Sequence, residues 1–366
     1  MKYTQSVAAR PLCTALLVSA TLLGLLGAGA AEAQSLRDVR SSDSPLVLKS
    51  RGSFYVGGEQ VEKTAVELGS FGPDDRITVN QMYVEYMVPA GAAKVPVVMV
   101  HGATLSGKTY DTTPDGRMGW YEYFVRKSHP VYVVDQVGRA RSGFDQSAFN
   151  NVRAGRMPPD QQPNLLRLAD HFGSWTNFRI GPEPGKTFPE TKFPVEAAAE
   201  MSKQSVPDLL GTSRAPNPTW KALSDLALQL NGAVLLTHSQ SGPYPLRAAL
   251  INAQGVRGIV MVEPGTCNGK VHTDDEIARL AKTPIFILFG DHLSSPTKLP
   301  GPSWDDRFND CKAFKARVDA AKGDVRLMTT ADAGVRGNSH MMMMDKNNLQ
   351  IADLILAWIN EKAGRR

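Results

Sequence analysis

The sequence has few cysteines, few aromatic residues, little excess charge and only one long hydrophobic run. Its 366 residues include 3 cysteines and 7% aromatics, with 41 basic against 36 acidic side chains. A formal net charge of +5, with no run of lysine and arginine, does not indicate a nucleic-acid-binding protein. A content of 42% hydrophobic and 21% charged residues excludes a mainly disordered chain, and a single hydrophobic run excludes a polytopic membrane protein.

That hydrophobic run lies at the N-terminus and predicts a secretory signal peptide. Lys2 and Arg10 precede an apolar stretch over residues 11–30, and Ala31-Glu32-Ala33 offers a small-residue cleavage site. We therefore expect residues 1–33 to be removed and the mature protein to be periplasmic or secreted. An uncleaved membrane anchor is the alternative, and stable membrane association is not expected of the mature chain.

Export changes the reading of the cysteines. Cys13 would leave with the signal peptide, so the mature chain would keep Cys267 and Cys311. An even pair in an oxidising compartment suggests a disulfide, with two buried free thiols as the alternative.

The rest of the chain alternates between apolar strand-like runs and helix-like patterns. Most runs are continuously apolar, which is typical of parallel strands covered by helices on both faces. This alternation predicts an α/β protein with a mostly parallel, doubly wound sheet, in a single domain over residues 34–366. The expected strands are 81–89, 95–100, 131–135, 233–239, 258–264, 284–290 and 325–330, and the expected helices lie around 219–230, 242–252, 305–321 and 345–361.

Two segments depart from the alternation. Residues 34–52 are polar and serine-rich, and we expect them to form a loose lead-in. Residues 143–218 contain 10 of the 24 prolines and no strong strand, but include amphipathic pieces such as 164–178. Because a long insertion after a sheet strand is often a lid, this segment is expected to be a cap.

A serine in a short strand-to-helix connection is the candidate nucleophile. Residues 237–242 (THSQSG) close one expected strand and open a helix, as a nucleophile elbow around Ser239 would. Thr237 and Ser241 occupy the two small positions that are glycines in the usual G-x-S-x-G pattern. Capping of the helix by Ser239 and Ser241 is the alternative, and Ser241 is the rival nucleophile.

A serine nucleophile needs a base and an acid that orients the base. His340 follows the last expected strand and precedes the final helix, which is the position of the base in the order Ser, acid, His. The usual position of the acid holds Leu293, and Asp291 lies two residues earlier. Glu263, at the end of the preceding strand, is favoured because its longer side chain helps it to reach His340, and Asp291 is the second choice.

The loop after the expected strand 95–100 allows two interpretations. An oxyanion hole needs two main-chain donors, and we expect these to be the N–H groups of Ala103 and Gln240. Residues 102–109 of the same loop match the G-x-x-x-x-G-K-[ST] phosphate-loop pattern, which would make Lys108 a nucleotide ligand. Export to a compartment poor in nucleoside triphosphates makes nucleotide binding the weaker alternative.

Together, five segments resemble the Alcaligenes-type family of secreted bacterial α/β-hydrolase esterases. The resemblance implies an α/β-hydrolase fold and a carboxylesterase in which Ser239 attacks, His340 relays protons and Glu263 orients His340. Relatives can carry cysteines in the oxyanion loop, where this chain has Ala103 and Thr104, and this difference leaves a main-chain role intact. The segments are residues 112–120, 238–242, 262–265, 289–292 and 337–343.

The resemblance also implies a disulfide between Cys267 and Cys311 and a homodimer. The expected reaction is hydrolysis of a small-molecule ester through an acyl-enzyme, with no metal or organic cofactor. An amidase, urethane hydrolase or lactonase would use the same triad, and a non-catalytic ligand-binding protein would keep the pocket.

Aromatic and methionine side chains remain to be placed. Trp120, Phe172, Trp175 and Phe178 line the substrate pocket or hold the cap onto the sheet. The four methionines 341–344 are expected to fill the core rather than to bind copper, because consecutive helical residues would point in different directions.

Overall fold

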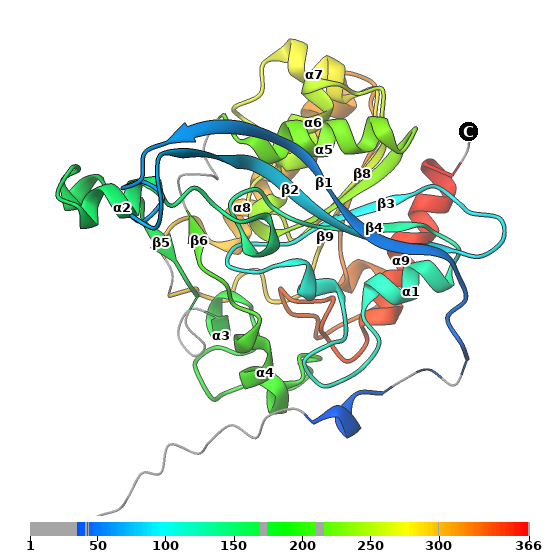
Figure 1. The fold of residues 1–366 in the computed structure, drawn as a ribbon. Helices are drawn as coiled ribbons and strands as arrows, with labels where there is room; N and C mark the ends of the chain where they lie inside the picture. The colour runs from blue at the N-terminus through cyan, green and yellow to red at the C-terminus, as the bar shows by residue number, and fades with distance from the viewer. Residues whose placement is uncertain are drawn as a thin grey trace, which may run out of the picture. The chain divides into compact units, whose positions relative to one another are not determined.

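An eight-stranded sheet lies at the centre of the computed structural model, which describes residues 35–40, 42, 44–168, 174–209, 216–298 and 300–364 (Figure 1). The strand order is β1-β2-β4-β3-β7-β8-β9-β10, and neighbours from β4 to β10 are parallel. At the other edge, β1 and β2 form an antiparallel hairpin that pairs with β4. The strands are β1 (Leu48–Lys63), β2 (Asp75–Pro89), β3 (Val97–Val100), β4 (Val131–Asp135), β7 (Ala233–His238), β8 (Val256–Val262), β9 (Ile285–Phe289) and β10 (Val325–Thr329).

Helices cover both faces of this sheet. Helices α1 (Trp120–Arg126) and α9 (Asn348–Lys362) pack on one face, and α5 (Pro218–Gln229), α6 (Tyr244–Ile251) and α8 (Trp304–Ala320) pack on the other. In β7, Val234 and Leu236 join the first core, whereas Ala233 and Leu235 join the second. Both faces are therefore buried, which explains the continuously apolar strands. Helix α7 (Asp274–Leu280) lies beside α6 and α8.

All seven expected strands and all four expected helices are present. The expected loose lead-in 34–52 is wrong at its end, because β1 begins at Leu48. This edge strand pairs only with β2 and exposes many of its side chains, so it lacks the apolar run of the central strands. The short helix α1 was also not expected, and β2 is antiparallel to its neighbours.

The inserted residues 143–218 contain little regular structure in their described part. Apart from single-turn 3-10 helices, that part contains the helices α2 (Ser147–Arg153), α3 (Trp175–Asn177) and α4 (Ala198–Lys203). It also contains an antiparallel pair of two-residue strands, β5 (Leu165–Leu166) and β6 (Asp208–Leu209). The amphipathic stretch 164–178 thus holds β5 and the single turn α3, and Phe172 lies outside the described residues. Among the described residues, the single-turn 3-10 helices are η1 (Leu36–Asp38), η2 (Gly107–Tyr110), η3 (Ala140–Ser142), η4 (Pro159–Gln161), η6 (Val195–Ala197), η8 (Ser239–Ser241) and η9 (Ala331–Ala333).

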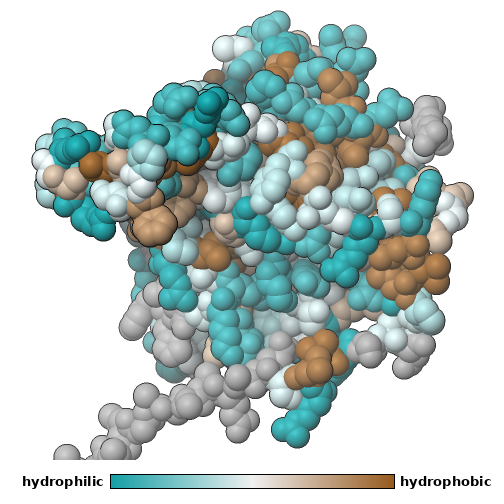
Figure 2. Space-filling view, viewed as in Figure 1, coloured by the Kyte–Doolittle hydropathy of each residue, from teal (hydrophilic) through white to brown (hydrophobic). Residues whose placement is uncertain are grey.

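The surface is mixed in character. On the face shown in Figure 2, hydrophilic side chains predominate and hydrophobic ones form small, separate groups. Such scattered apolar side chains are normal for the surface of a folded protein. No helix in the described ranges has the length and hydrophobicity needed to cross a bilayer. The expected signal peptide, residues 1–33, lies outside those ranges.

Candidate active site

Ser239 directly follows β7 and is the first residue of η8, in the turn that leads from this strand to α6. Its φ of 58° falls in the left-handed region, which non-glycine residues rarely adopt. Two glycines permit the surrounding chain to approach this closely. A Cβ atom on Gly242 would lie 2.5 Å from Pro264 Cβ, and one on Gly102 would lie 2.9 Å from Ser239 Cβ. This geometry is that of a nucleophile elbow at the carboxyl edge of the sheet.

Ser241, the rival nucleophile, has a different environment. Its side chain is fully buried, and its Oγ lies 3.1 Å from the Val100 carbonyl and 3.0 Å from the His238 carbonyl. The same Oγ accepts a hydrogen bond from the His238 main-chain N–H. Ser239 is only half-buried and lines a cavity, so the structure leaves Ser239 accessible and Ser241 engaged.

Glu263 and His340 are brought together by two loops at the same sheet edge. Glu263 directly follows β8, and His340 lies in the loop between β10 and α9. Both side chains are fully buried, and the Glu263 Oε2 atom lies 2.8 Å from His340 Nδ1. The other carboxylate oxygen, Oε1, accepts hydrogen bonds from the Gly290 N–H and from Arg179.

Arg179 is a buried partner of Glu263 that the sequence patterns did not predict. It comes from the inserted segment, is 1% exposed, and donates from Nη2 to Glu263 Oε1 over 2.5 Å. Its Nε donates to the Asp291 carbonyl over 2.7 Å. Burial favours the neutral form of Glu263, but the charge of Arg179 and the contact with His340 outweigh it and lower the Glu263 pKa to about 2. The carboxyl is therefore ionised throughout the neutral pH range.

His340 is held among aromatic rings. Its ring centroid lies 5.1 Å from that of Phe178, 4.4 Å from that of Trp304 and 4.6 Å from that of His238. Burial lowers the His340 pKa below its ordinary value of 6.5, although Glu263 raises it in part. A neutral imidazole with Nδ1–H bound to Glu263 presents a basic Nε2. That Nε2 makes no hydrogen bond to a described residue, Ser239 included.

Asp291, the second choice for the acid, serves the His340 loop in another way. Its carboxylate accepts a hydrogen bond from the Gly337 N–H, and its own N–H donates to the Asn338 carbonyl over 2.9 Å. Asp345 also holds this loop, because its carboxylate accepts hydrogen bonds from Ser339 N–H, Ser339 Oγ and Asn338 Nδ2. Burial raises the pKa of Asp345 to about 7 despite those hydrogen bonds.

Ala103 and Gln240 line the same cavity as Ser239. Neither main-chain N–H donates to an acceptor among the described residues. The loop that carries Ala103 is tied to the inserted segment, because Val206 N–H donates to the Thr104 carbonyl over 2.8 Å. The Asp208 carboxylate accepts from Thr104 N–H and from the Gln240 side chain.

A buried ion pair supports this arrangement. Arg139 and Asp208 are at most 2% exposed, and their side chains approach to 2.5 Å.

Two histidines also hold the main chain of the site. His101 Nδ1 contacts the Gly102 carbonyl at 2.8 Å, and His238 Nε2 contacts the His340 carbonyl at 3.0 Å. Burial lowers the pKa of both imidazoles, that of His101 to about 4.

The phosphate-loop pattern corresponds to a different structure. After β3, residues 107–110 form only the single turn η2 rather than the long helix that follows a phosphate loop. Lys108 Nζ donates to the Thr112 carbonyl, and the Gly107 N–H donates to Asp135 Oδ1 over 2.7 Å. A carboxylate thus occupies a main-chain donor that a phosphate would use.

The cavity beside Ser239 has a volume of about 230 Å³. Three of the aromatic residues considered for the pocket, Trp120, Trp175 and Phe178, do not line it, and the fourth, Phe172, lies outside the described residues. Trp120 is fully buried in the core and donates to the Asn348 carbonyl, Trp175 donates to the Lys186 carbonyl, and Phe178 stacks on His340. Among the described residues the lining contains one aromatic side chain, that of Trp304. The described lining consists of Ala103, Asn177, Ser239, Gln240, Gly265, Thr297, Pro300, Pro302, Trp304 and Arg307.

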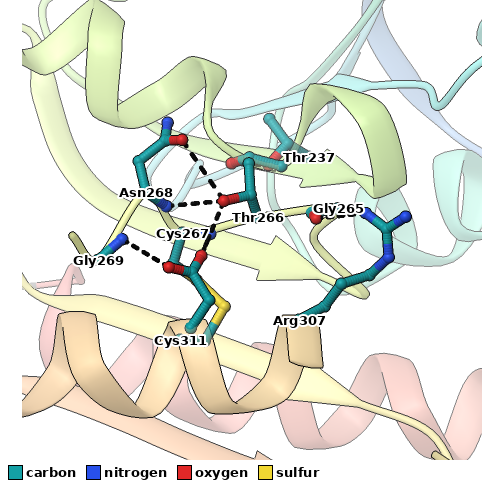
Figure 3. The surroundings of a disulfide bond; sticks show 10 residues. Thr237, Gly265, Thr266, Cys267, Asn268, Gly269, Arg307 and Cys311 are labelled. Carbon is teal, nitrogen blue, oxygen red and sulfur yellow. Dashed lines mark hydrogen bonds between the residues drawn. A yellow bond between two sulfur atoms is a disulfide. The ribbon is translucent and has the colours of Figure 1, made fainter. Parts of the chain in front are cut away.

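The disulfide and the four consecutive methionines lie in segments that adjoin the site residues Glu263 and His340. Cys267 and Cys311 form a disulfide between the loop after β8 and helix α8, as expected from the resemblance (Figure 3). The four methionines 341–344 are all buried in one core, as predicted, but they form a turn before α9 rather than part of the helix.

The chain is similar to known proteins in both sequence and structure. No protein-family model matches it. A solved structure described as a novel bacterial esterase is 44% identical, superposes with a TM-score of 0.82, and covers 88% of this chain and 99% of its own. A protein of a fungus (Fungal sp.), named "Probable secreted lipase phiG", is 28% identical over an alignment of 357 positions, which covers 84% of this chain and 89% of that protein.

The mostly parallel sheet, the helices on both of its faces and the match to the bacterial esterase structure define an α/β hydrolase. Within that class, the chain belongs to the esterase and lipase group, whose members hydrolyse carboxylic esters.

Proposed function

We propose that this protein is a serine esterase of the Alcaligenes type, with Ser239, Glu263 and His340 as its catalytic triad. The observation that carries the proposal is the 2.8 Å contact between Glu263 Oε2 and His340 Nδ1, and the left-handed conformation of Ser239 at the end of β7 supports it. Such a contact fixes the tautomer of the histidine and stabilises the imidazolium that forms during catalysis. The basic Nε2 is then the atom that accepts the proton of Ser239.

The reaction proceeds in two halves. Ser239 Oγ attacks the ester carbonyl while His340 Nε2 takes its proton, and the N–H groups of Ala103 and Gln240 stabilise the oxyanion. The tetrahedral intermediate collapses as His340 returns the proton to the leaving alcohol, which leaves an acyl-enzyme. Water, deprotonated by His340, then attacks the acyl carbon, and the acid departs as Ser239 regains its proton.

The proposal includes a cap, export and dimerisation. Residues 143–218 act as the cap, and support comes from Arg179, Phe178 and Asp208, which contact site residues. Cleavage after Ala33 and export agree with the disulfide and with the description of the fungal relative as secreted. The homodimer rests on the resemblance. N-terminal sequencing and light scattering of the purified protein test the last two points.

Hydrolysis of p-nitrophenyl acetate by wild type, Ser239→Ala and Ser241→Ala tests the nucleophile. We expect Ser239→Ala to lower kcat by at least about 1000-fold, while Ser241→Ala retains turnover. Loss of activity only in Ser241→Ala would contradict the assignment. Matched amides, carbamates and lactones in the same assay separate an esterase from its alternatives, and the esters are expected to react fastest.

A further inference from the structure

Among the described residues that line the cavity beside Ser239, Arg307 alone carries a formal charge, and the others are neutral. No acidic side chain belongs to the described lining, so the charge that this lining presents to a ligand is positive.

Arg307 lies close to the nucleophile. It belongs to the first turn of α8, and its Nη1 donates to the Gly265 carbonyl (Figure 3). A Cβ atom on Gly265 would lie 3.4 Å from Arg307 Nη1 and 3.4 Å from the Ser239 carbonyl oxygen. The guanidinium and the main chain of Ser239 therefore both lie close to the same glycine.

The charge of Arg307 has no described counter-ion. No acidic side chain of the described residues forms an ion pair with it. The two acids nearest to it are engaged elsewhere, since Asp306 accepts hydrogen bonds from Ser303 and Glu263 binds Arg179 and His340. The buried Nε of Arg307 also has no acceptor. A guanidinium offers five N–H donors, and such a fork matches the two oxygens of a carboxylate.

The position of Arg307 is fixed by the framework around it. Its guanidinium stacks on Trp304 with 5.1 Å between the guanidinium carbon and the ring centroid. One helical turn further along α8, the Cys267–Cys311 disulfide and the contacts of Asp310 with Thr266 and Cys267 hold the helix to the loop (Figure 3). A cation held in this way loses little freedom when it binds an anion.

We propose that the preferred substrates are small esters that carry a free carboxylate, which Arg307 binds while Ser239 attacks the ester carbonyl. This inference rests on the proposed function. The class includes half-esters of short dicarboxylic acids and acyl esters of short hydroxy acids. In both, the carboxylate lies a few bonds from the scissile carbonyl, in keeping with a small cavity.

Two pairs of substrates of equal shape test the inference. Monomethyl succinate is compared with methyl levulinate, and acetoxyacetate with acetoxyacetone, because each pair differs chiefly in replacing a carboxylate by an acetyl group. Hydrolysis is followed by acid release at constant pH, with p-nitrophenyl acetate as an independent assay of the proposed function. In at least one pair we expect kcat/KM to favour the anion by about tenfold or more, mainly through KM.

Variants then assign the preference to Arg307. Arg307→Gln should bring the ratio close to one, Arg307→Lys should retain part of it, and Lys315→Gln, a control on the same helix paired with Asp319, should keep it. A wild-type ratio of one or less in both pairs would overturn the inference, as would a preference that survives in Arg307→Gln. Turnover of p-nitrophenyl acetate without turnover of these esters would also overturn it. Failure of the proposed function is distinct, because p-nitrophenyl acetate would then not react at Ser239.

Discussion

The carboxyl edge of the sheet and the inserted residues 143–218 contribute to the active site in different ways. The sheet edge supplies the groups proposed for chemistry, Ser239 and Glu263 directly after adjacent strands and His340 in the loop after β10. The insertion supplies Arg179 and Asp208, which contact site residues without belonging to the proposed triad. Topology thus positions the reactive groups, and a segment with little regular structure sets their charge state and orientation.

The largest effect is expected within the sheet edge itself. Glu263→Gln should lower kcat by about 1000-fold to 10,000-fold, because the amide cannot stabilise the imidazolium. Asp291→Asn should cost less than about tenfold, since the only described hydrogen bond of the Asp291 carboxylate is to the main chain of the His340 loop, at Gly337 N–H. Steady-state kinetics with p-nitrophenyl acetate measures both, and circular dichroism checks folding. The reverse order of the two effects would assign the acid to Asp291.

The insertion should show its influence most clearly at Arg179. Arg179→Gln removes the charge that keeps Glu263 ionised, so the Glu263 pKa should rise from about 2 toward the value that burial alone favours. Activity needs the ionised form, and the acid limb of the kcat/KM profile should therefore move to higher pH. At pH 7 we expect a loss of about tenfold to 100-fold. Lys186→Gln, in the same segment and paired with exposed Glu183, is the control. An unshifted acid limb would show that Arg179 has only a structural role.

A smaller effect is expected at Asp208, which contacts the loop proposed to form the oxyanion hole. Asp208→Asn keeps the shape of the side chain but removes the charge that faces Arg139, so the Thr104 and Gln240 contacts should weaken. We expect kcat to fall about threefold to tenfold with little change in KM. Asp225→Asn, an exposed acid paired with Lys221, is the matched control. Equal kinetics in the two variants would show that Asp208 does not support the proposed oxyanion hole.

The smallest effect on activity is expected at Asp345, beneath the His340 loop, where stability is the better measurement. Its pKa of about 7 in the folded state lies above the ordinary 3.8, so the folded state binds this proton more tightly. The stability that this gives is complete below about pH 4 and is lost as the pH rises through about 7. The free energy of unfolding of wild type minus that of Asp345→Asn, from urea titrations, should therefore be smaller at pH 8 than at pH 5. A difference that does not change with pH would contradict this account.

The sheet and its edge could be predicted because buried parallel strands leave a local signal. Most central strands are continuous apolar runs, and the predictions for Ser239 and His340 follow from their positions at strand ends. The edge strand β1 left no such signal, because it is paired on one side only and much of it is exposed.

The contributions of the insertion could not be predicted, because they arise only in the folded chain. Arg179 lies 84 residues from Glu263 in sequence, and Asp208 lies 104 residues from Thr104. No local pattern around these two residues distinguishes them from solvent-exposed charges. Likewise, Trp120, Trp175 and Phe178 are the right residue types for a pocket, but burial and hydrogen bonding put them in its supporting structure.

Covalent labelling tests the central assignment most directly. The purified protein is treated with a fluorophosphonate, digested and analysed by mass spectrometry to locate the adduct. We predict a single adduct on Ser239 Oγ that is absent from Ser239→Ala and strongly slowed in His340→Ala. An adduct on Ser241, or labelling that persists in Ser239→Ala, would contradict the account.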